Sequence, residues 1–197
     1  MQHDVDGCVP VEVIAYFNGA PMKMQDVITC HQVGAYITCK SLILRDVLEA
    51  FSEDASILCE QAGLEFVCNL GQSEFVVRAN QDALVTVLHN LLSNAIKYNC
   101  LDGSSFCCCD REGEWAIVRL INTGKGIPAE DHAKIFDRFY RADRARSRAV
   151  DGFGLGLNIA QEMTRAIGGA STLERSDDTS TIFSIAFLIV EKVPANA

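Results

Sequence analysis

Hydrophobic residues recur every three or four positions in three long segments, and this spacing predicts three helices with one apolar face each. The segments are 44–62, 81–98 and 155–167. Gly63 follows the first, and a pair of glycines follows the third, as is typical of helix ends. A shorter helix is expected over 129–137, directly after a proline.

Short apolar runs between these segments predict strands. The expected strands are 64–70 and 74–77, joined by a Gly-Gln-Ser turn; 105–109 and 115–121, forming a hairpin; and 171–175 and 181–189, flanking a polar turn. Helices and strands alternate, but hairpins occur as well. This order predicts an α+β domain of two layers, in which helices cover one face of a mixed sheet.

The first 41 residues lack any such period and are interrupted by glycines and prolines, apart from a possible strand at 11–17. We therefore expect an N-terminal extension or linker remnant over 1–41, one domain over 42–190, and a C-terminal tail over 191–197.

The acidic charge balance narrows the possible partners. The formal net charge is -9 and the sequence pI is about 4.9, which argues against a nucleic-acid partner. Any phosphate bound by this chain would have to be held by a local site and a metal ion. No apolar run reaches the roughly 18 residues of a membrane span, so direct membrane insertion is not expected.

The chain has 9 cysteines, but their spacing does not resemble a zinc framework. No C-x-x-C occurs, and Cys107, Cys108 and Cys109 are adjacent, so alternate side chains would point to opposite faces of a strand. The odd count and the lack of a signal peptide favour reduced thiols and a cytoplasmic location. Small buried hydrophobic side chains are the expected role of most of them.

Asn90, Asn94 and Lys97 are spaced four and three apart on the second predicted helix, so they share a face opposite the apolar one. Amide oxygens are hard ligands suited to Mg²⁺, and a lysine suits a phosphate. The alternative is a solvated polar helix face.

Two glycine-containing segments follow. In 122–128, Asn122 ends a predicted strand, and two glycines spaced by one residue would let the backbone approach a ligand. In 151–157, Gly152, Gly154 and Gly156 open the third predicted helix, where exposed amides and the helix dipole favour phosphate. The alternatives are an ordinary strand-to-helix turn and a helix that starts after a flexible loop.

An arginine-rich stretch lies between these two segments and includes Arg138 and Arg141. It could close over a nucleotide as a lid, with arginine meeting phosphate charge. For most of its arginines, a solvated loop is the better interpretation.

Together, these segments resemble the catalytic and ATP-binding domain of sensor histidine kinases, within the superfamily shared with gyrase, Hsp90 and MutL. The resemblance covers about 42–190: an N box at 89–99, a first glycine box at 122–128, an F box at 135–140 and a second glycine box at 152–157. It implies the Bergerat fold, a mixed sheet of about five strands covered on one face by three helices, with ATP on the helical side.

The resemblance also implies roles for individual residues. Asn94 and Asn90 would bind Mg²⁺, Lys97 would reach phosphate, and Tyr98 would pack on the adenine. The remaining implied nucleotide-binding residues are Asn122, Gly124, Gly126, Ile127, Gly152, Phe153, Gly154, Leu155, Gly156, Leu157 and Thr181. Arg138 and Arg141 would act from the lid during catalysis.

The sequence departs from the family pattern in two places. Asn122 stands where the family usually has an aspartate that accepts a hydrogen bond from the adenine amino group. An amide can still accept through its oxygen, but it could also be turned to donate. None of the four histidines, His3, His31, His89 and His132, lies in a phosphoacceptor context. The phosphoryl acceptor would therefore be a histidine outside this chain.

The resulting hypothesis is an enzyme domain that binds ATP and Mg²⁺ and transfers the γ-phosphoryl group to a histidine on a dimerisation domain. A response regulator receiver would be a further partner. The full-length protein would be a homodimer. A degenerate module that only binds nucleotide, or only scaffolds, is the alternative. An ATPase ranks lower, because those superfamily members have a glutamate where this chain has Asn90. The F box and long lid favour a histidine kinase over a serine kinase of the anti-sigma type.

Overall fold

A computed structural model describes residues 16–17, 20–21, 37–71, 74–142 and 154–190. The chain divides into two compact units, 1–34 and 35–197. In the first unit, the described residues form an antiparallel pair of two-residue strands, β1 (Tyr16–Phe17) and β2 (Ala20–Pro21). β1 is the end of the strand expected over 11–17, whose other residues lie outside the described part. The tail at 191–197 lies outside it too, and the domain limits at 41 and 190 stay predictions.

The second unit contains a mixed five-stranded sheet in the order β4-β6-β7-β9-β8. The strands are β4 (Glu65–Asn69), β6 (Ser104–Glu112), β7 (Trp115–Thr123), β8 (Ala170–Ser176) and β9 (Ser180–Leu188). β4 runs parallel to β6, and the other neighbours are antiparallel.

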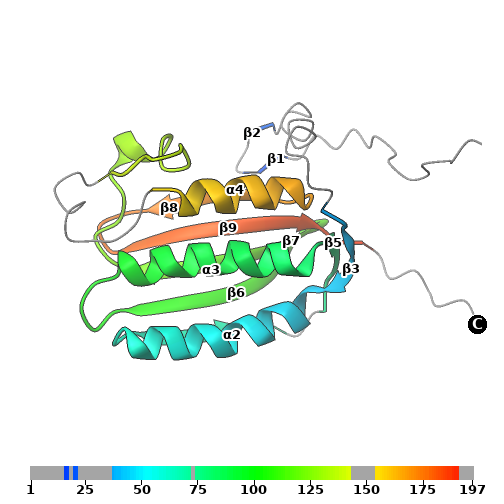
Figure 1. Cartoon of the computed structure of the whole chain (residues 1–197), viewed down its shortest axis with the longest axis horizontal. Helices are drawn as coiled ribbons and strands as arrows, with labels where there is room; N and C mark the ends of the chain where they lie inside the picture. The colour runs from blue at the N-terminus through cyan, green and yellow to red at the C-terminus, as the bar shows by residue number, and fades with distance from the viewer. Residues whose placement is uncertain (1–15, 18–19, 22–36, 72–73, 143–153, 191–197) are drawn as a thin grey trace, which may run out of the picture. The chain divides into compact units, whose positions relative to one another are not determined.

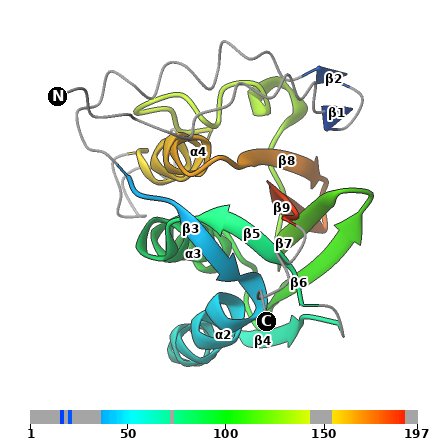
Figure 2. The ribbon, with the colours of Figure 1, turned by 90° about the vertical axis from the view of Figure 1, so that its right-hand side faces the viewer.

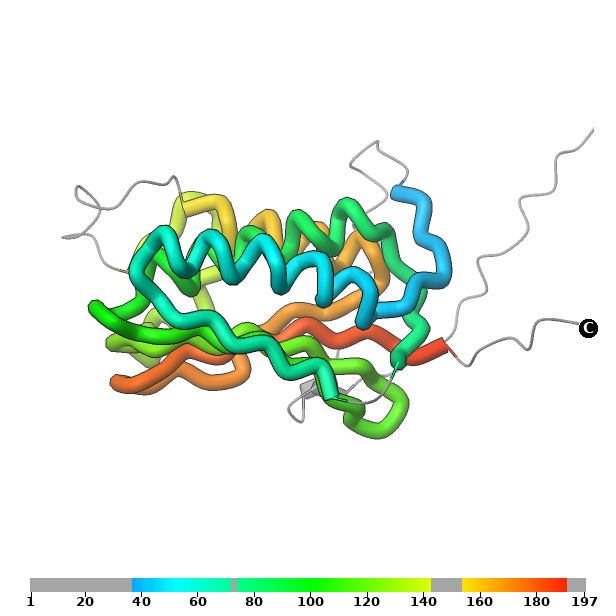
Figure 3. The backbone as a smooth tube through the Cα atoms, turned by 90° about the horizontal axis from the view of Figure 1, so that it is seen from below, coloured from blue at the N-terminus to red at the C-terminus, as the bar shows by residue number. Residues whose placement is uncertain are grey.

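Three helices lie side by side on one face of this sheet (Figure 1), and the view from below separates the two layers (Figure 3). They are α2 (Leu44–Gln61), α3 (Gln81–Lys97) and α4 (Gly156–Ala166). The α+β sandwich expected from the sequence, with a mixed sheet of five strands and three helices, is confirmed. None of the helices in the described part combines the length and apolar character that a membrane span requires.

A smaller sheet stands at one end of the helices (Figure 2) and consists of β3 (Lys40–Ile43) and β5 (Val76–Ala79), paired antiparallel. The two strands expected around the Gly-Gln-Ser turn therefore follow one another but pair with different partners. β4 joins the edge of the large sheet, whereas β5 pairs with the strand that leads into α2.

The core lies between the two layers, and its residues follow the apolar periods of the sequence. Fully or almost fully buried side chains come from all three parts: Leu44, Leu48 and Phe51 of α2; Leu84, Leu88 and Leu91 of α3; and Val118, Ile185 and Phe187 of the sheet. Removing one such leucine side chain typically costs about 2–5 kcal/mol. On β7 the buried row runs Ala116, Val118, Leu120 and ends at Asn122. A polar side chain thus occupies the last position under the helices.

The segment at 129–137 differs from its prediction. Only Ala129–Asp131 form a helical turn, the 3-10 helix η2, and turns follow. Two contacts bend the chain here: the Tyr140 hydroxyl donates to Asp131 Oδ1 at 2.5 Å, and His132 Nε2 donates to the Ile127 carbonyl at 2.8 Å. Phe139, just beyond, has a φ of 65°, which a right-handed helix does not allow.

Candidate functional site

A cavity of about 1140 Å³ is bounded by α3, by the start of α4 and by the ends of strands β7, β8 and β9. Most residues predicted from the sequence line it: Asn90, Asn94, Lys97, Tyr98, Asn122, Gly126, Ile127, Arg141, Gly154, Leu155, Gly156, Leu157 and Thr181. Gly124 and Arg138 do not line it, and Gly152 and Phe153 lie outside the described residues.

The two asparagines of α3 are held in one orientation by their own helix. Asn90 Nδ2 donates to the Thr86 carbonyl at 2.9 Å, and Asn94 Nδ2 donates to the Asn90 carbonyl at 3.1 Å. A carbonyl oxygen can only accept, so the nitrogen of each amide must lie on that side. Each amide oxygen is then the end of the side chain that can accept a hydrogen bond or bind a cation.

The end of α3 brings a cation and an aromatic ring to the cavity. Lys97 Nζ lies 5.4 Å from the centre of the Tyr98 ring, within the range of a cation–π contact. Tyr98 keeps 43% of its surface exposed, so its ring is available to a flat ligand at the cavity wall.

The start of α4 faces the α3 amides. A Cβ built at Gly156, the first residue of α4, would lie 3.3 Å from Asn90 Oδ1. Gly154 has a φ of 69°, and a Cβ there would lie 2.7 Å from the Tyr140 carbonyl oxygen. Leu155, the residue before the helix, has an apolar side chain and forms no capping hydrogen bond among the described residues. The first amides of α4 thus form the kind of helix N-terminus that binds anions.

The two glycines of the first glycine box contact different parts of the chain. Gly126 has a φ of 69°, and a Cβ there would lie 2.0 Å from the Asp177 carbonyl oxygen. Gly124 has a φ of 145°, and its Cβ would lie 2.5 Å from the Tyr98 carbonyl oxygen. Gly126 therefore fits against the β8–β9 turn beside the cavity, whereas Gly124 fits against the end of α3 and shapes the cavity only indirectly.

Asn122 and Thr181 are direct partners in the register of β7 and β9, and both line the cavity. Both are almost fully buried, at 4% and 5% exposed. Asn122 Nδ2 donates to the Thr123 carbonyl at 2.8 Å, so its amide oxygen is the accepting end, as it is in Asn90 and Asn94.

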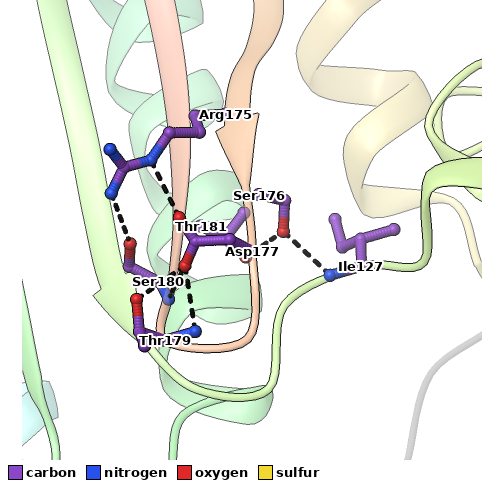
Figure 4. Close-up of polar contacts among 7 residues, drawn as sticks. All are labelled: Ile127, Arg175, Ser176, Asp177, Thr179, Ser180 and Thr181. Atoms are coloured by element: carbon purple, nitrogen blue, oxygen red, sulfur yellow. Dashed lines mark hydrogen bonds and ion pairs between the residues drawn. The ribbon is translucent and has the colours of Figure 1, made fainter.

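Sequence reasoning missed Ser176, which also lines the cavity. Its Oγ accepts a hydrogen bond from the Ile127 amide at 2.8 Å and lies 2.8 Å from Thr181 Oγ1 (Figure 4). A serine at the end of a predicted strand carries no signal of its own. Only the pairing of β8 with β9 brings it beside Thr181.

Asp177, also missed, closes the β8–β9 turn. Its Oδ1 accepts hydrogen bonds from the Thr179 hydroxyl at 2.6 Å and the Thr179 amide at 2.9 Å, and its Oδ2 lies 3.0 Å from Arg175 Nε (Figure 4). These contacts, the Thr179 hydroxyl first, lower the pKa of Asp177 below its ordinary value. A carboxylate therefore stands at the cavity wall on the strand side.

Thr123 fastens the segment after α3 to the sheet. Its hydroxyl donates to Asn99 Oδ1 at 2.6 Å and accepts from the Ser104 amide at 2.9 Å. Asn99 Nδ2 donates onward to Ser105 Oγ at 3.2 Å. A Cβ at Gly103 would lie 2.1 Å from Asn99 Oδ1, so only glycine fits at this crossing.

The F box is attached through its buried residues. The rings of Phe136 and Phe183 meet edge to face at 6.2 Å, and Asn158 Nδ2 of α4 donates to the Phe136 carbonyl at 2.9 Å. Arg138 is exposed and does not line the cavity, whereas Arg141 is half-buried and does. Of the two predicted lid arginines, only Arg141 is therefore brought to the site.

The described residues contain no group of three or more His, Cys, Asp or Glu side chains that could hold a metal ion. A cation bound beside α3 would depend on amide oxygens and on oxygens of a bound ligand, because the carboxylates in the lining, Asp177 and Asp178, belong to the β8–β9 turn. The seven cysteines of the described part are free thiols, and burial raises the pKa of Cys109 to about 12. Cys59, Cys107 and Cys109 belong to the buried core, as small hydrophobic side chains do.

Comparison with known proteins points in one direction. The sequence model of one family, described as histidine kinase-, DNA gyrase B-, and HSP90-like ATPase, matches residues 79–191. The sensor histidine kinase WalK of Bacillus subtilis is 40% identical over 129 residues, which are 63% of this chain and 21% of WalK. The sensor histidine kinase RppB of Synechocystis is 32% identical over 149 residues, which are 76% of this chain and 32% of RppB.

Solved structures agree on the fold. A mycobacterial sensor histidine kinase, MprB, superposes with a TM-score of 0.66 at 22% identity, covering 76% of this chain and 98% of that one. Full-length ShkA in complex with AMPPNP superposes with a TM-score of 0.69 at 20% identity, covering 84% of this chain and 34% of ShkA. The chain spans about a fifth to two fifths of the length of the curated relatives it matches.

Proposed function

The chain belongs to the family of histidine kinase-, DNA gyrase B- and HSP90-like ATPases, and from that premise we propose that it binds ATP with Mg²⁺ and transfers the γ-phosphoryl group to a histidine on a separate helical domain. One observation carries the proposal: oriented amides of α3, a glycine box after β7 and the start of α4 converge on a single cavity.

The helix side of the cavity suits the triphosphate and its metal. The amide oxygens of Asn90 and Asn94 are neutral hard ligands of the kind Mg²⁺ accepts together with phosphate oxygens and water. Lys97 supplies a positive charge, and the first amides of α4 supply hydrogen-bond donors. Gly154 and Gly156 keep that helix end open, because a side chain at either position would crowd its neighbours.

The strand side suits the base. Asn122 and Thr181 offer buried polar groups next to each other, with Ile127 and Tyr98 as apolar walls. Asp177 and Asp178 place carboxylates at the strand side of the lining, where Lys125 also lies. We expect the phosphates to lie toward α3 and α4, because the amides at the start of α4 and Lys97 are there.

Phosphoryl transfer needs positioning and neutralisation of charge more than it needs a protein base. The acceptor imidazole has its own lone pair, so no strong base is required in the cavity. Asn90 is suited to this task rather than to hydrolysis, because an amide does not take a proton from water at neutral pH. Asn90 and Asn94 would hold Mg²⁺, which would supply positive charge to offset that of the phosphates. Arg141 lines the cavity, and we expect its guanidinium to meet phosphate charge.

The test mixes this chain with radiolabelled ATP, Mg²⁺ and the purified histidine-bearing domain of the full-length protein. Transfer should produce an acid-labile phosphoprotein, and replacement of the acceptor histidine by glutamine should abolish it. Calorimetry with ATP and ADP on the same samples separates the two halves of the proposal. Binding without transfer would leave a nucleotide-binding module, and no binding would overturn the proposal as a whole.

A further inference from the structure

We propose that Ser176 is a positioning residue for base recognition: it directs the hydroxyl of Thr181 so that Asn122 and Thr181 present one acceptor and one donor to a purine edge, and thereby favour adenine over guanine. The inference rests on the proposed function, because it takes the cavity to hold a nucleotide base.

The acceptor is the amide oxygen of Asn122. The Thr123 carbonyl holds Asn122 Nδ2 at 2.8 Å, and turning the amide over would place two oxygens against each other. At 4% exposure, Asn122 has little room to turn away. The replacement of the family's usual aspartate by asparagine therefore preserves an acceptor at this position.

The donor follows from counting protons. Ser176 and Thr181 have two hydroxyl protons, and the contact of 2.8 Å between their oxygens uses one of them. The other remains for the cavity, which both residues line. Either hydroxyl can be the donor in this contact, and because Ser176 Oγ already accepts from the Ile127 amide at 2.8 Å, we assign its proton to Thr181 Oγ1. The proton that faces the ligand is then that of Thr181.

Ser176 can act in this way because its position is fixed from two sides. The Ile127 amide holds its oxygen, and the close fit of Gly126 against the Asp177 carbonyl, at 2.0 Å for a built Cβ, fixes the backbone next to it. Asp177 in turn is held by the amides and hydroxyl of the turn that it closes (Figure 4).

The two groups match adenine and oppose guanine. Directly paired residues on antiparallel strands have Cβ atoms roughly 4.5–5.5 Å apart, so both side chains can reach one edge of a base. Adenine presents an amino donor beside a ring-nitrogen acceptor, whereas guanine has a carbonyl oxygen in place of the amino group. Guanine would set that oxygen against the amide oxygen of Asn122, two acceptors without a proton between them.

The experiment measures binding of ATP, GTP and the 1-deaza and 7-deaza analogues of ATP to the whole chain by calorimetry with Mg²⁺. One deaza analogue lacks the nitrogen that accepts from Thr181, and the wild type should bind it about 5- to 10-fold more weakly than ATP, the effect of one lost hydrogen bond. GTP should bind at least as weakly. Thr181→Val should remove the preference for ATP over that analogue.

The variants of Ser176 test whether it acts through Thr181. Ser176→Ala should shrink the ratio of ATP affinity to analogue affinity about threefold, and Ser176→Thr, which keeps the hydroxyl, should restore it. In a Thr181→Val background, Ser176→Ala should leave the ratio unchanged.

Two results would overturn the inference. In the first, Ser176→Ala weakens the binding of ATP and of both analogues by one common factor, as general damage to the cavity would. In the second, Ser176→Ala changes the ratio of ATP affinity to analogue affinity even in the Thr181→Val background. Failure of the wild type to bind ATP at all is a different result, and it would overturn the proposed function instead.

Discussion

At the residue scale, three asparagines use the same device. The side-chain amide nitrogens of Asn90, Asn94 and Asn122 each donate a hydrogen bond to a backbone carbonyl, at 2.9, 3.1 and 2.8 Å. An amide is by nature both donor and acceptor, and this contact leaves it with a single character. These three amides thus give the cavity acceptors without negative charge, which suits the triphosphate of the proposed ligand.

Replacing Asn94 by alanine should weaken binding of ATP at least about tenfold when Mg²⁺ is present, because one metal or phosphate contact is lost. In EDTA the wild type and the variant should differ much less. Calorimetry in both conditions checks this. Asn69→Ala, which removes an amide from edge strand β4 remote from the cavity lining, serves as the control and should change neither value. An equal loss with and without Mg²⁺ would rule out a metal role.

Gly126→Ala should destabilise the fold by roughly 2–4 kcal/mol, since it combines a left-handed φ of 69° with a clash at 2.0 Å against backbone. Gly113→Ala is the matched control: its φ is 61°, but a built Cβ there meets nothing within 4 Å. That variant should cost only about 1 kcal/mol. Urea unfolding of both variants measures the difference. Equal costs would mean that backbone conformation, not contact with Asp177, decides the choice of glycine.

At the element scale, the spacing of apolar residues in the sequence predicted most of the helices and strands, but few of the contacts that build the cavity. The three long helices could be predicted because each buries one continuous apolar face, such as Leu84, Leu88 and Leu91 of α3. The helix expected over 129–137 was wrong, since a spacing of apolar residues does not reveal the contacts of His132 with the Ile127 carbonyl and of Tyr140 with Asp131.

The cavity residues divide in the same way. Asn90, Asn94 and the described part of the second glycine box, 154–157, could be predicted to lie together because each belongs to one helix or to its start. Ser176 and Asp177 were not, because what makes them important is the register between β8 and β9 and the close fit of Gly126. A local pattern does not encode the register of two strands, nor the contacts of Gly126 and Ile127 with residues about 50 positions later.

Bound nucleotide should protect the first turn of α4 from hydrogen exchange. Leu155 provides no side-chain cap among the described residues, so phosphate oxygens would be the partners of the first amides. Exchange followed by mass spectrometry should show slowing over the peptide that includes Gly156 and Leu157 on addition of ATP and Mg²⁺. The amides of α2, which contributes nothing to the cavity lining, provide the internal control. Uniform slowing of both helices would indicate global stabilisation alone.

The β8–β9 turn should keep Asp177 ionised to lower pH than an ordinary aspartate. Its folded-state pKa is lowered, so the stabilisation is present above the unfolded pKa, about 3.9, and is lost as the pH falls through the folded value. Titration of the carboxyl carbon by NMR measures that value directly. Thr179→Val removes the largest cause and should raise the pKa toward the ordinary one, whereas Thr86→Val, on α3, should leave it unchanged.

At the scale of the whole domain, the cavity takes residues from both layers, from Asn90 on α3 to Thr181 on β9. Under the proposed function, the helices would supply most phosphate contacts and the sheet would supply the base contacts. A bound nucleotide would then contact both layers, and its binding free energy would add to the stability of the folded state.

The sheet order has a consequence for how this domain is made in the cell. β9 comes last along the chain among the described strands, yet it lies inside the sheet, between β7 and β8. Until residues 180–188 have left the ribosome, β7 can pair with β6 alone, and β8 lacks the strand it pairs with. We expect every product of interrupted translation that ends before β9 to lack the cavity wall that Thr181 provides, and therefore to bind the proposed nucleotide poorly.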